Sequence, residues 1–419
     1  MIPSRTFTNK PGATFDALKT TVIFAEDLND IIANISNVSV LSLKITYTGE
    51  FQTALVLPIV KNSIAIVPRG SVAGQATYTA PAGPTIAKFL YNESATIFFA
   101  NTLLTFSFDD LVGVSGDFNP TNCASLTSLS MNALVSVGGV FSPQTMMALT
   151  TLSATSLKYV GSNFVFANMG ALTSLSMNAL VSVGGAFTPS GMASLTTLSF
   201  TSLLSVGGSF SPSSMASLTT FSFPALVLVS GSMSLSNFAA LTNLTMNALV
   251  SCVGGVNLSN FAALTTFSFA SLKTSGACSI SNAASLTTVS INSLEQMTGG
   301  FVLATMASLT TVSLSRLINM GANISFQTSN GNISSVNIGT IGTLKNLGFI
   351  INISGQKLPS ANVNYILALL VSLNGTGGTT LWGTGRTLTI NGGTNGAPTG
   401  QGIIDKATLV ARGATITTN

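Results

Sequence analysis

The sequence predicts a mainly β protein. Its central part is a β-solenoid of about ten 23-residue coils, between a small α+β module at the N-terminus and an α+β cap at the C-terminus. Two observations lead to this fold class. A segment that begins at Leu126 (LTSLSMNALVSVGGVFSPQTMMA) returns at a fixed spacing, and apolar and polar residues alternate within each copy with the period of a half-buried strand. The expected domains are residues 1–102, 103–341 and 342–419.

The repeat covers more than half of the chain. Each copy opens on a leucine 23 residues after the last, apart from one interval of 22: Leu126, Leu149, Leu172, Leu195, Leu218, Leu241, Leu264, Leu286 and Leu309. Weaker copies at Leu103 and Ile333 flank this array. Because one coil cannot bury its own apolar edge, the copies are expected to stack and close a common core.

Each copy predicts two short strands and a corner. The opening pattern L-x-x-L-x-Φ is the first strand, and the glycine pair of Val137-Gly138-Gly139 suits a tight corner because glycine takes positive φ without steric cost. A second strand then carries a bulky residue, which in stacked coils forms one internal column: Phe118, Phe141, Phe164, Phe187, Phe210, Met233, Val256, Cys278 and Phe301.

Asparagines recur four residues before the opening leucine, at Asn122, Asn168, Asn237, Asn260 and Asn282. Asparagine is common at corners, where its amide satisfies main-chain groups, so a structural role is the favoured interpretation. A ligand-binding role for these amides is the alternative.

The pattern LxxLxFxxLxxVGGxF…ALTxL resembles the BspA-type leucine-rich repeats of bacterial surface proteins. It is also similar to receptor-L-domain and Ecm33-like solenoids. The resemblance implies a leucine-rich-like β-solenoid and leaves the function open. Horseshoe-shaped leucine-rich repeats have asparagine where this chain has Leu134, Leu157 and Leu180. We therefore expect a straighter, β-rich solenoid without helices along its back.

The two flanks differ from the repeat. The N-terminal module has a helix candidate at 24–35 and alternating strands such as 40–47, and we expect it to attach the protein to a partner. The C-terminal part has helix candidates at 360–373 and 401–412 with strands around 380–390, and it is expected to cap the stack. Its last residues, GGTNGAPTGQG…KATLVARGATITTN, resemble the tails of structural proteins of phages that infect Bacteroidota.

Composition argues against several classes of protein. Only 6% of residues are charged, and Lys158 and Lys273 are the only charges between Phe118 and Leu294. A nucleic-acid binder needs clustered basic residues, so no nucleic-acid partner is expected. Polar residues interrupt every apolar run long before about 18 residues, so no membrane insertion is expected. The first ten residues contain no signal-peptide pattern, so we expect either a mature chain with a replaced start or a protein that does not use general secretion.

Residues for catalysis are scarce. The chain has no histidine, which removes Ser-His-Asp and Cys-His pairs, and Cys123, Cys252 and Cys278 all fall on core positions of the repeat. Asp109, Asp110 and Asp117 could gather around a calcium ion, although solvated turn carboxylates are the favoured interpretation. We therefore expect no enzyme, no metal and no cofactor.

The outward positions of the first strand form a candidate contact face made of hydroxyl side chains. Its members, two per coil, are Ser128, Ser130, Thr151, Ser153, Ser174, Ser176, Thr197, Ser199, Thr220, Ser222, Thr266 and Ser268, with further pairs at Asn243 and Thr245, Thr288 and Ser290, and Thr311 and Ser313. Serine and threonine keep an uncharged exposed sheet soluble. Ice binding and glycan binding are the alternatives; the mixture of Ser with Thr argues against ice, and the lack of exposed aromatics against glycans.

These features predict a non-enzymatic structural or adhesive protein of a virion: a phage fibre, spike or capsid-bound appendage. Other virion proteins would bind its N-terminal module, and a host surface glycan or protein would contact the solenoid. A cellular BspA-like adhesin, extracellular or on the cell surface, is the first alternative. A polysaccharide-acting enzyme built on a solenoid is the second. The low surface charge does little to resist association, and phage fibres commonly form trimers. We therefore expect a homo-oligomer, with a trimer as one form.

Overall fold

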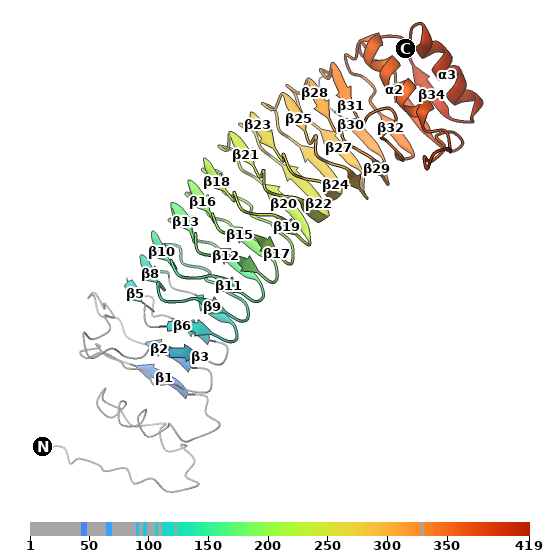
Figure 1. Ribbon diagram of the computed structural model, residues 1–419. Coiled ribbons are helices and arrows are strands. Elements are labelled where there is room, and N and C mark those ends of the chain that lie inside the picture. The colour runs from blue at the N-terminus through green and yellow to red at the C-terminus, as the bar shows by residue number, and fades with distance from the viewer. Residues whose placement is uncertain are drawn as a thin grey trace, which may run out of the picture.

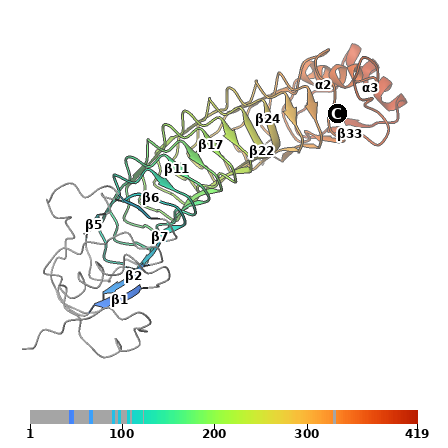
Figure 2. The same cartoon turned by 60° about the horizontal axis from the view of Figure 1, so that its bottom comes forward.

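A computed structural model describes most of the chain, and it is a parallel β-solenoid of about ten turns (Figure 1). The described residues are 43–47, 64–68, 89–91, 95–98, 105–107, 111–121, 124–327 and 331–419. The coils stack along one gently curved axis (Figure 2). The mainly β fold class and the repeat-by-repeat stacking predicted from the sequence are confirmed; the helix candidate at 24–35 lies outside the described residues.

The first strand of every coil lies on one side of the stack, where equivalent residues of neighbouring coils pair in parallel, as in Thr151 with Ser128. These strands are β5 (Thr105–Ser107), β8 (Ser128–Ser130), β10 (Thr151–Ser153), β13 (Ser174–Ser176), β16 (Thr197–Ser199), β18 (Thr220–Ser222), β21 (Asn243–Thr245), β23 (Thr266–Ser268), β25 (Thr288–Ser290), β28 (Thr311–Ser313) and β31 (Ser335–Asn337).

The rest of each coil forms one long sheet that bends at the glycine pair. Its strands are β3 (Phe89–Tyr91), β4 (Ala95–Phe98), β6 (Leu111–Val114), β7 (Phe118–Thr121), β9 (Ser136–Val137), β11 (Tyr159–Val160), β12 (Phe164–Ala167), β14 (Ser182–Val183), β15 (Phe187–Ser190), β17 (Ser205–Val206), β19 (Leu228–Val229), β20 (Ser232–Ser236), β22 (Ser251–Ser259), β24 (Thr274–Ser281), β26 (Gln296–Met297), β27 (Phe301–Ala304), β29 (Asn319–Met320) and β30 (Ile324–Gln327). The coil with the 22-residue interval is accommodated by a register shift between β22 and β24.

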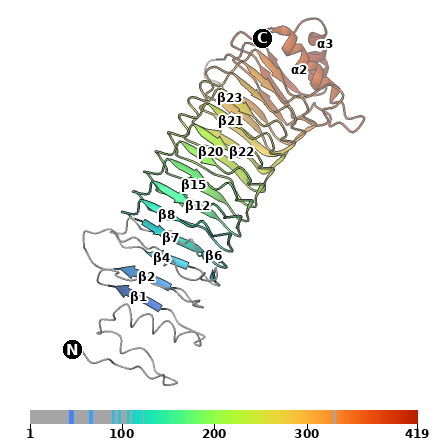
Figure 3. The same ribbon diagram turned by 60° about the vertical axis from the view of Figure 1, so that its left-hand side comes forward.

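The stack extends beyond both expected domain boundaries. On the N-terminal side, β3 pairs with β6 and β4 pairs with β7, so residues before 103 already belong to the solenoid sheet. Two earlier strands, β1 (Leu43–Tyr47) and β2 (Ile64–Pro68), pair with each other in parallel, and β2 lies against β4 (Figure 3). Parallel pairing uses only main-chain groups, so it continues where the side-chain consensus of the repeat has faded.

The C-terminal part also continues the sheet, through β32 (Ile350–Asn352), β33 (Thr387–Ile390) and β34 (Thr415–Thr418). Two helices separate these strands, α2 (Ser360–Ser372) and α3 (Gln401–Ala411), and both lie where the sequence predicted them. The cap therefore consists of helix-containing coils on the same sheet. Its only tryptophan, Trp382, is fully buried and donates its indole N–H to the Gly348 carbonyl at 3.2 Å.

The predicted core columns are confirmed. The opening leucines and the bulky second-strand residues between Phe118 and Phe301 are almost completely buried. Several phenylalanines of this column stack face to face, with ring centroids 4.8 Å apart for Phe164 and Phe187 and 5.1 Å apart for Phe187 and Phe210. Cys252 pairs with Val229, which occupies the position of Val137 in its own coil, so this cysteine lies on a core position as predicted.

The glycine pairs lie at a bend, as predicted, but for a different reason. Gly138, Gly161, Gly184 and Gly207 do not have positive φ. Each lies directly on the equivalent backbone of the preceding coil, and a Cβ on Gly184 would come within 2.2 Å of the Gly161 carbonyl oxygen. These positions therefore exclude a side chain because the backbones of neighbouring coils approach so closely, and the positive φ expected here occurs elsewhere.

A Gly184→Ala substitution should therefore destabilise the solenoid. The new methyl group would force two coils apart, at a cost of about 1–3 kcal/mol, measured as a lower midpoint of urea or thermal unfolding. Gly170→Ala is the matched control, because no atom lies within 4 Å of the added Cβ. Equal midpoints for the two variants would contradict this account of the glycine column.

Positive φ occurs instead four residues before the opening leucine. The residues concerned are Thr145, Asn168, Gly191, Ser214, Asn237, Asn260, Asn282 and Thr305, with φ between 54° and 67°. The asparagine ladder therefore lies at a corner with left-handed backbone conformation, which asparagine adopts more readily than β-branched residues do. Its amides bond one another: Asn260 Nδ2 donates to Asn237 Oδ1 at 2.7 Å, and Asn282 Nδ2 to Asn260 Oδ1 at 2.8 Å. The corner position expected for this ladder is confirmed, but its amides bond one another rather than main-chain groups; Asn122 lies outside the described residues.

Replacing Thr305 by asparagine should stabilise the protein. Threonine at φ 54° is strained, and an asparagine there would follow Asn282 in the amide ladder. We expect the free energy of unfolding to rise by about 1 kcal/mol, seen as a higher thermal midpoint. Ser308→Asn, at an exposed residue of the same coil, should change it by less than about 0.5 kcal/mol. A lower midpoint for Thr305→Asn would contradict the strain argument.

Candidate contact face of the solenoid

The predicted contact face is present as two columns of outward hydroxyls on the side of the stack formed by the first strands of the coils, which we call the first sheet. The first column, which includes Thr151, Thr220 and Thr266, is mostly exposed, whereas the second, which includes Ser153 and Ser222, is half-buried. The remaining members, Ser128, Ser130, Ser174, Ser176, Thr197, Ser199 and Ser268, lie in the same two columns and also point away from the core. Neighbouring coils repeat the pattern at the strand spacing of about 4.8 Å.

Several hydroxyls of the half-buried column bond to asparagines of the preceding coil. Ser153 Oγ donates to Asn132 Oδ1, and Ser268 Oγ donates to Asn247 Oδ1 at 2.7 Å. The same asparagine oxygens also accept main-chain N–H groups, as from Ala270 to Asn247 at 3.3 Å. These serines therefore hold neighbouring coils together. The repeat pattern did not reveal the asparagines, because only some coils carry one. The more exposed first column remains the better candidate for contact.

A third column of hydroxyls lies beside these two and is more regular than either. It holds the threonine that follows the opening leucine, at Thr127, Thr150, Thr173, Thr196, Thr219, Thr242, Thr265, Thr287 and Thr310. At the regular junctions the Oγ1 atom donates to the main-chain carbonyl of the preceding coil, as in Thr196 to Thr173 at 3.0 Å. The Leu-Thr dipeptide that recurs at the start of each copy could have predicted this column from the sequence. This column widens the face and fixes the orientation of its side chains.

The first sheet is interrupted at three places, which we call seams. Hydrogen-bonded pairing is absent between β10 and β13, between β18 and β21, and between β23 and β25, all within residues 124–327. At each seam the inward residue of the strand before it, Leu152, Phe221 or Phe267, is 8% exposed, whereas Leu198 and Leu244 at the same position are 0% exposed. The seams thus open the core slightly to the contact face.

Each seam comes directly before a coil with an asparagine in its first turn: Asn178, Asn247 or Asn292. The oxygen of each of these asparagines bonds to the following coil, as Asn178 Oδ1 does to Ser199 Oγ and to the Thr201 amide, both at 3.2 Å. The asparagine therefore strengthens the junction on its C-terminal side and makes no hydrogen bond to a described residue across the seam on its N-terminal side.

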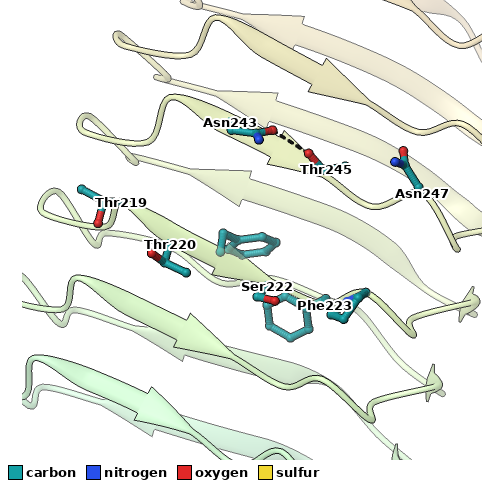
Figure 4. Close-up of a pocket in the computed structure, with 9 residues that line it drawn as sticks. Thr219, Thr220, Ser222, Phe223, Asn243, Thr245 and Asn247 are labelled. Atoms are coloured by element: carbon teal, nitrogen blue, oxygen red, sulfur yellow. Dashed lines mark hydrogen bonds between the residues drawn. The ribbon is translucent and has the colours of Figure 1, made fainter.

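The middle seam forms a shallow groove of about 430 Å³ on the contact face (Figure 4). One wall is Thr219, Thr220, Phe221, Ser222, Phe223 and Pro224, and the other is Asn243, Thr245 and Asn247. Figure 4 shows the two walls on neighbouring coils, with Thr245 bonded to Asn243. None of these nine residues is charged. The groove joins exposed hydroxyls and amides to the edge of a buried phenylalanine.

The candidate calcium site can be followed only at Asp117, since Asp109 and Asp110 lie outside the described residues. Asp117 Oδ1 accepts the Val140 N–H of the next coil at 2.7 Å, and Asn163 Oδ1 accepts the Ala186 N–H in the same way at 2.8 Å. Asp117 therefore occupies a structural position that an asparagine fills elsewhere. Within the described residues, no three His, Cys, Asp or Glu side chains gather closely enough to hold a metal ion.

Two of the three cysteines are described, and both are buried free thiols. Burial raises the pKa of Cys278 to about 12, and the neighbouring Cys252 adds to the effect. Burial also raises the pKa of Cys252, although main-chain hydrogen bonds with Met233 and Gly255 act in the opposite direction. The core role predicted for these two residues is confirmed, and Cys123 lies outside the described residues.

These thiols should resist modification in the folded protein. A raised pKa keeps each thiol protonated and unreactive at about pH 8, because only the thiolate attacks a disulfide reagent. In a Cys123→Ser background, Ellman's reagent should therefore detect almost no thiol in the folded state. Both thiols should react once guanidinium unfolds the chain. Rapid labelling of either cysteine before unfolding would contradict the burial.

An exposed apolar strip runs along the bend that follows the first strand. Leu204, Val227 and Val250 lie on consecutive coils, joined by main-chain bonds of 2.9 Å, and are 48%, 41% and 36% exposed. Lys158, two coils before Leu204, and Lys273, one coil after Val250, occupy the same column. Exposed apolar patches on an otherwise polar surface are typical of interaction sites.

Comparison with known proteins gave no match among family models, curated proteins or solved structures. Among the helices of the described residues, none is both long and apolar enough to cross a membrane.

Proposed function

We propose that this protein is a non-enzymatic virion component, a phage fibre, spike or capsid-bound appendage whose solenoid contacts the host surface. The observation that carries the proposal is the contact face itself. Three columns of uncharged hydroxyl and amide side chains cover one side of consecutive coils, and coil-to-coil bonds hold many of them in place. A rigid, uncharged surface of this length is suited to repeated weak contacts rather than to chemistry at one point.

The virion assignment draws further support from the resemblance of the C-terminal tail to phage structural proteins. In this proposal the N-terminal end attaches to other virion proteins, and the stacked coils project the contact face outward. The resemblance of the repeats to BspA-type surface proteins supports a cellular adhesin as the second candidate. Both candidates use the same face, and they differ in the particle or cell that carries it.

Oligomerisation remains part of the proposal. The apolar strip of Leu204, Val227 and Val250 is the described surface best suited to contact between copies of the chain, because apolar area is what stable association buries. A trimer, as in many phage fibres, would place three such strips around a common axis.

Mass spectrometry of density-purified particles tests the proposal. Peptides of this chain should co-purify with the particle at a constant ratio to the capsid protein. The purified protein, added first, should also slow adsorption of the particle to its host by occupying receptors. Recovery of the chain only in the cell envelope fraction would contradict the virion proposal and favour the adhesin.

A further inference from the structure

We infer that the groove at the middle seam, between β18 and β21, is a binding site for a short neutral saccharide. This inference deepens the proposed function and rests on it for the source of the saccharide, a host surface. The groove volume of about 430 Å³ lies within the ~300–1,000 Å³ of small-molecule sites in proteins. Its lining combines an aromatic edge with hydroxyls and amides, which match the two kinds of surface on a sugar ring.

The apolar contribution comes from Phe221. The seam leaves 8% of this side chain exposed, and the neighbouring rings fix its position. Its centroid lies 4.7 Å from that of Phe223 and 6.0 Å from that of Phe238. A ring held in this way loses little entropy when a ligand packs against it. The C–H groups of a sugar ring are the apolar surface that would cover its exposed edge.

The polar contribution comes from side chains already oriented by internal bonds. Asn243 Oδ1 accepts from Thr245 Oγ1 at 2.5 Å, and Asn247 Oδ1 accepts from Ser268 Oγ at 2.7 Å. Each of these two amide oxygens therefore accepts an internal hydrogen bond, which orients the side chain. No hydrogen bond to another described residue joins either Nδ2 atom or the Thr220 hydroxyl. These groups can donate to or accept from sugar hydroxyls.

The main chain adds further bonding groups at the seam. Where neighbouring first strands are paired, the carbonyl of the threonine after the opening leucine accepts two N–H groups of the next coil. Thr242 O, for example, accepts from Thr265 at 2.9 Å and from Thr266 at 3.1 Å. Among the described residues, the equivalent bonds to Thr219 O are missing. The Thr219 carbonyl and the facing amides of Thr242 and Asn243 are thus left to water or to a ligand. Ordered hydroxyls of a ligand can replace such water.

The chemistry of the groove favours a neutral saccharide over other ligands. Its nine lining residues carry no charge, so an anionic ligand would find no counter-charge. A peptide could bind by strand addition only at an open sheet edge. The seam is instead bounded by consecutive coils of one stack, which leave no room for an inserted strand at about 4.8 Å per strand. The peptide is therefore an alternative that the experiment must test.

The test is a titration of the full-length protein with a panel of neutral hexasaccharides of glucose, mannose, galactose and N-acetylglucosamine. Saturation-transfer NMR should detect binding of at least one member at concentrations up to about 10 mM. Phe221→Leu, which places the residue found at Leu198 and Leu244 in this position, and Asn247→Ala should each weaken that binding about tenfold. Because the groove is uncharged, the affinity should be nearly constant between about 0.05 and 0.5 M salt.

Asn178→Ala is the matched control. Asn178 makes the same two kinds of bond to the following coil as Asn247 does, but the seam before it exposes Leu152 instead of a phenylalanine. The two asparagine variants should lose similar stability, and only Asn247→Ala should lose binding. Equal loss of binding in both variants would show an indirect effect and overturn the inference.

Three other results would also overturn it: no binding by any member of the panel, binding that survives both groove variants, or binding at the groove of an extended valine-threonine hexapeptide in place of every saccharide. Failure of the proposed function gives a different result. If the groove variants abolish saccharide binding but the chain is absent from purified particles and does not affect adsorption, the saccharide site stands and the virion role fails.

Discussion

The structure depends on main-chain hydrogen bonds that run along the stack and join each coil to equivalent residues of the next. This bonding requires the coils to keep almost the same length and to approach closely at every turn. The glycine column shows the consequence, because a Cβ on Gly184 would meet the Gly161 carbonyl oxygen at 2.2 Å. The 22-residue interval meets the same requirement by a register shift between Cys252 and Gly255, where Gly255 takes a φ of 102°.

Side chains are fitted to this main-chain scaffold in columns, which is why so much of the fold could be predicted from the sequence. Apolar residues at a fixed period mark the buried leucine and phenylalanine positions without any knowledge of the strands. The physical reason for a column was harder to predict. The glycine pairs were expected to provide positive φ, yet that conformation falls at Asn168, Asn237 and Asn260, because a bend and a left-handed corner both select small or polar residues.

The features that the repeat did not predict are those that depend on one coil differing from the next. The seams coincide with differences of this kind: Asn247 bonds to the coil after it, and Pro224 offers no side-chain acceptor to the coil that follows. A comparison of copies averages such differences away. The extension of the sheet through β3 and β4 was hidden for a related reason, because main-chain pairing persists after the side-chain pattern has faded.

The difference between regular coils and seams also explains how a solenoid of this composition can acquire a specific site. A regular array of hydroxyls presents the same weak contacts at every coil, so it offers no reason for a ligand to stop at one place. A seam changes this locally: it exposes part of Phe221, leaves the Thr219 carbonyl without its ladder partners and brings two oriented amides to the surface. Specificity on this surface would therefore arise where the stacking is imperfect, and the regular coils on either side would hold that imperfection rigid.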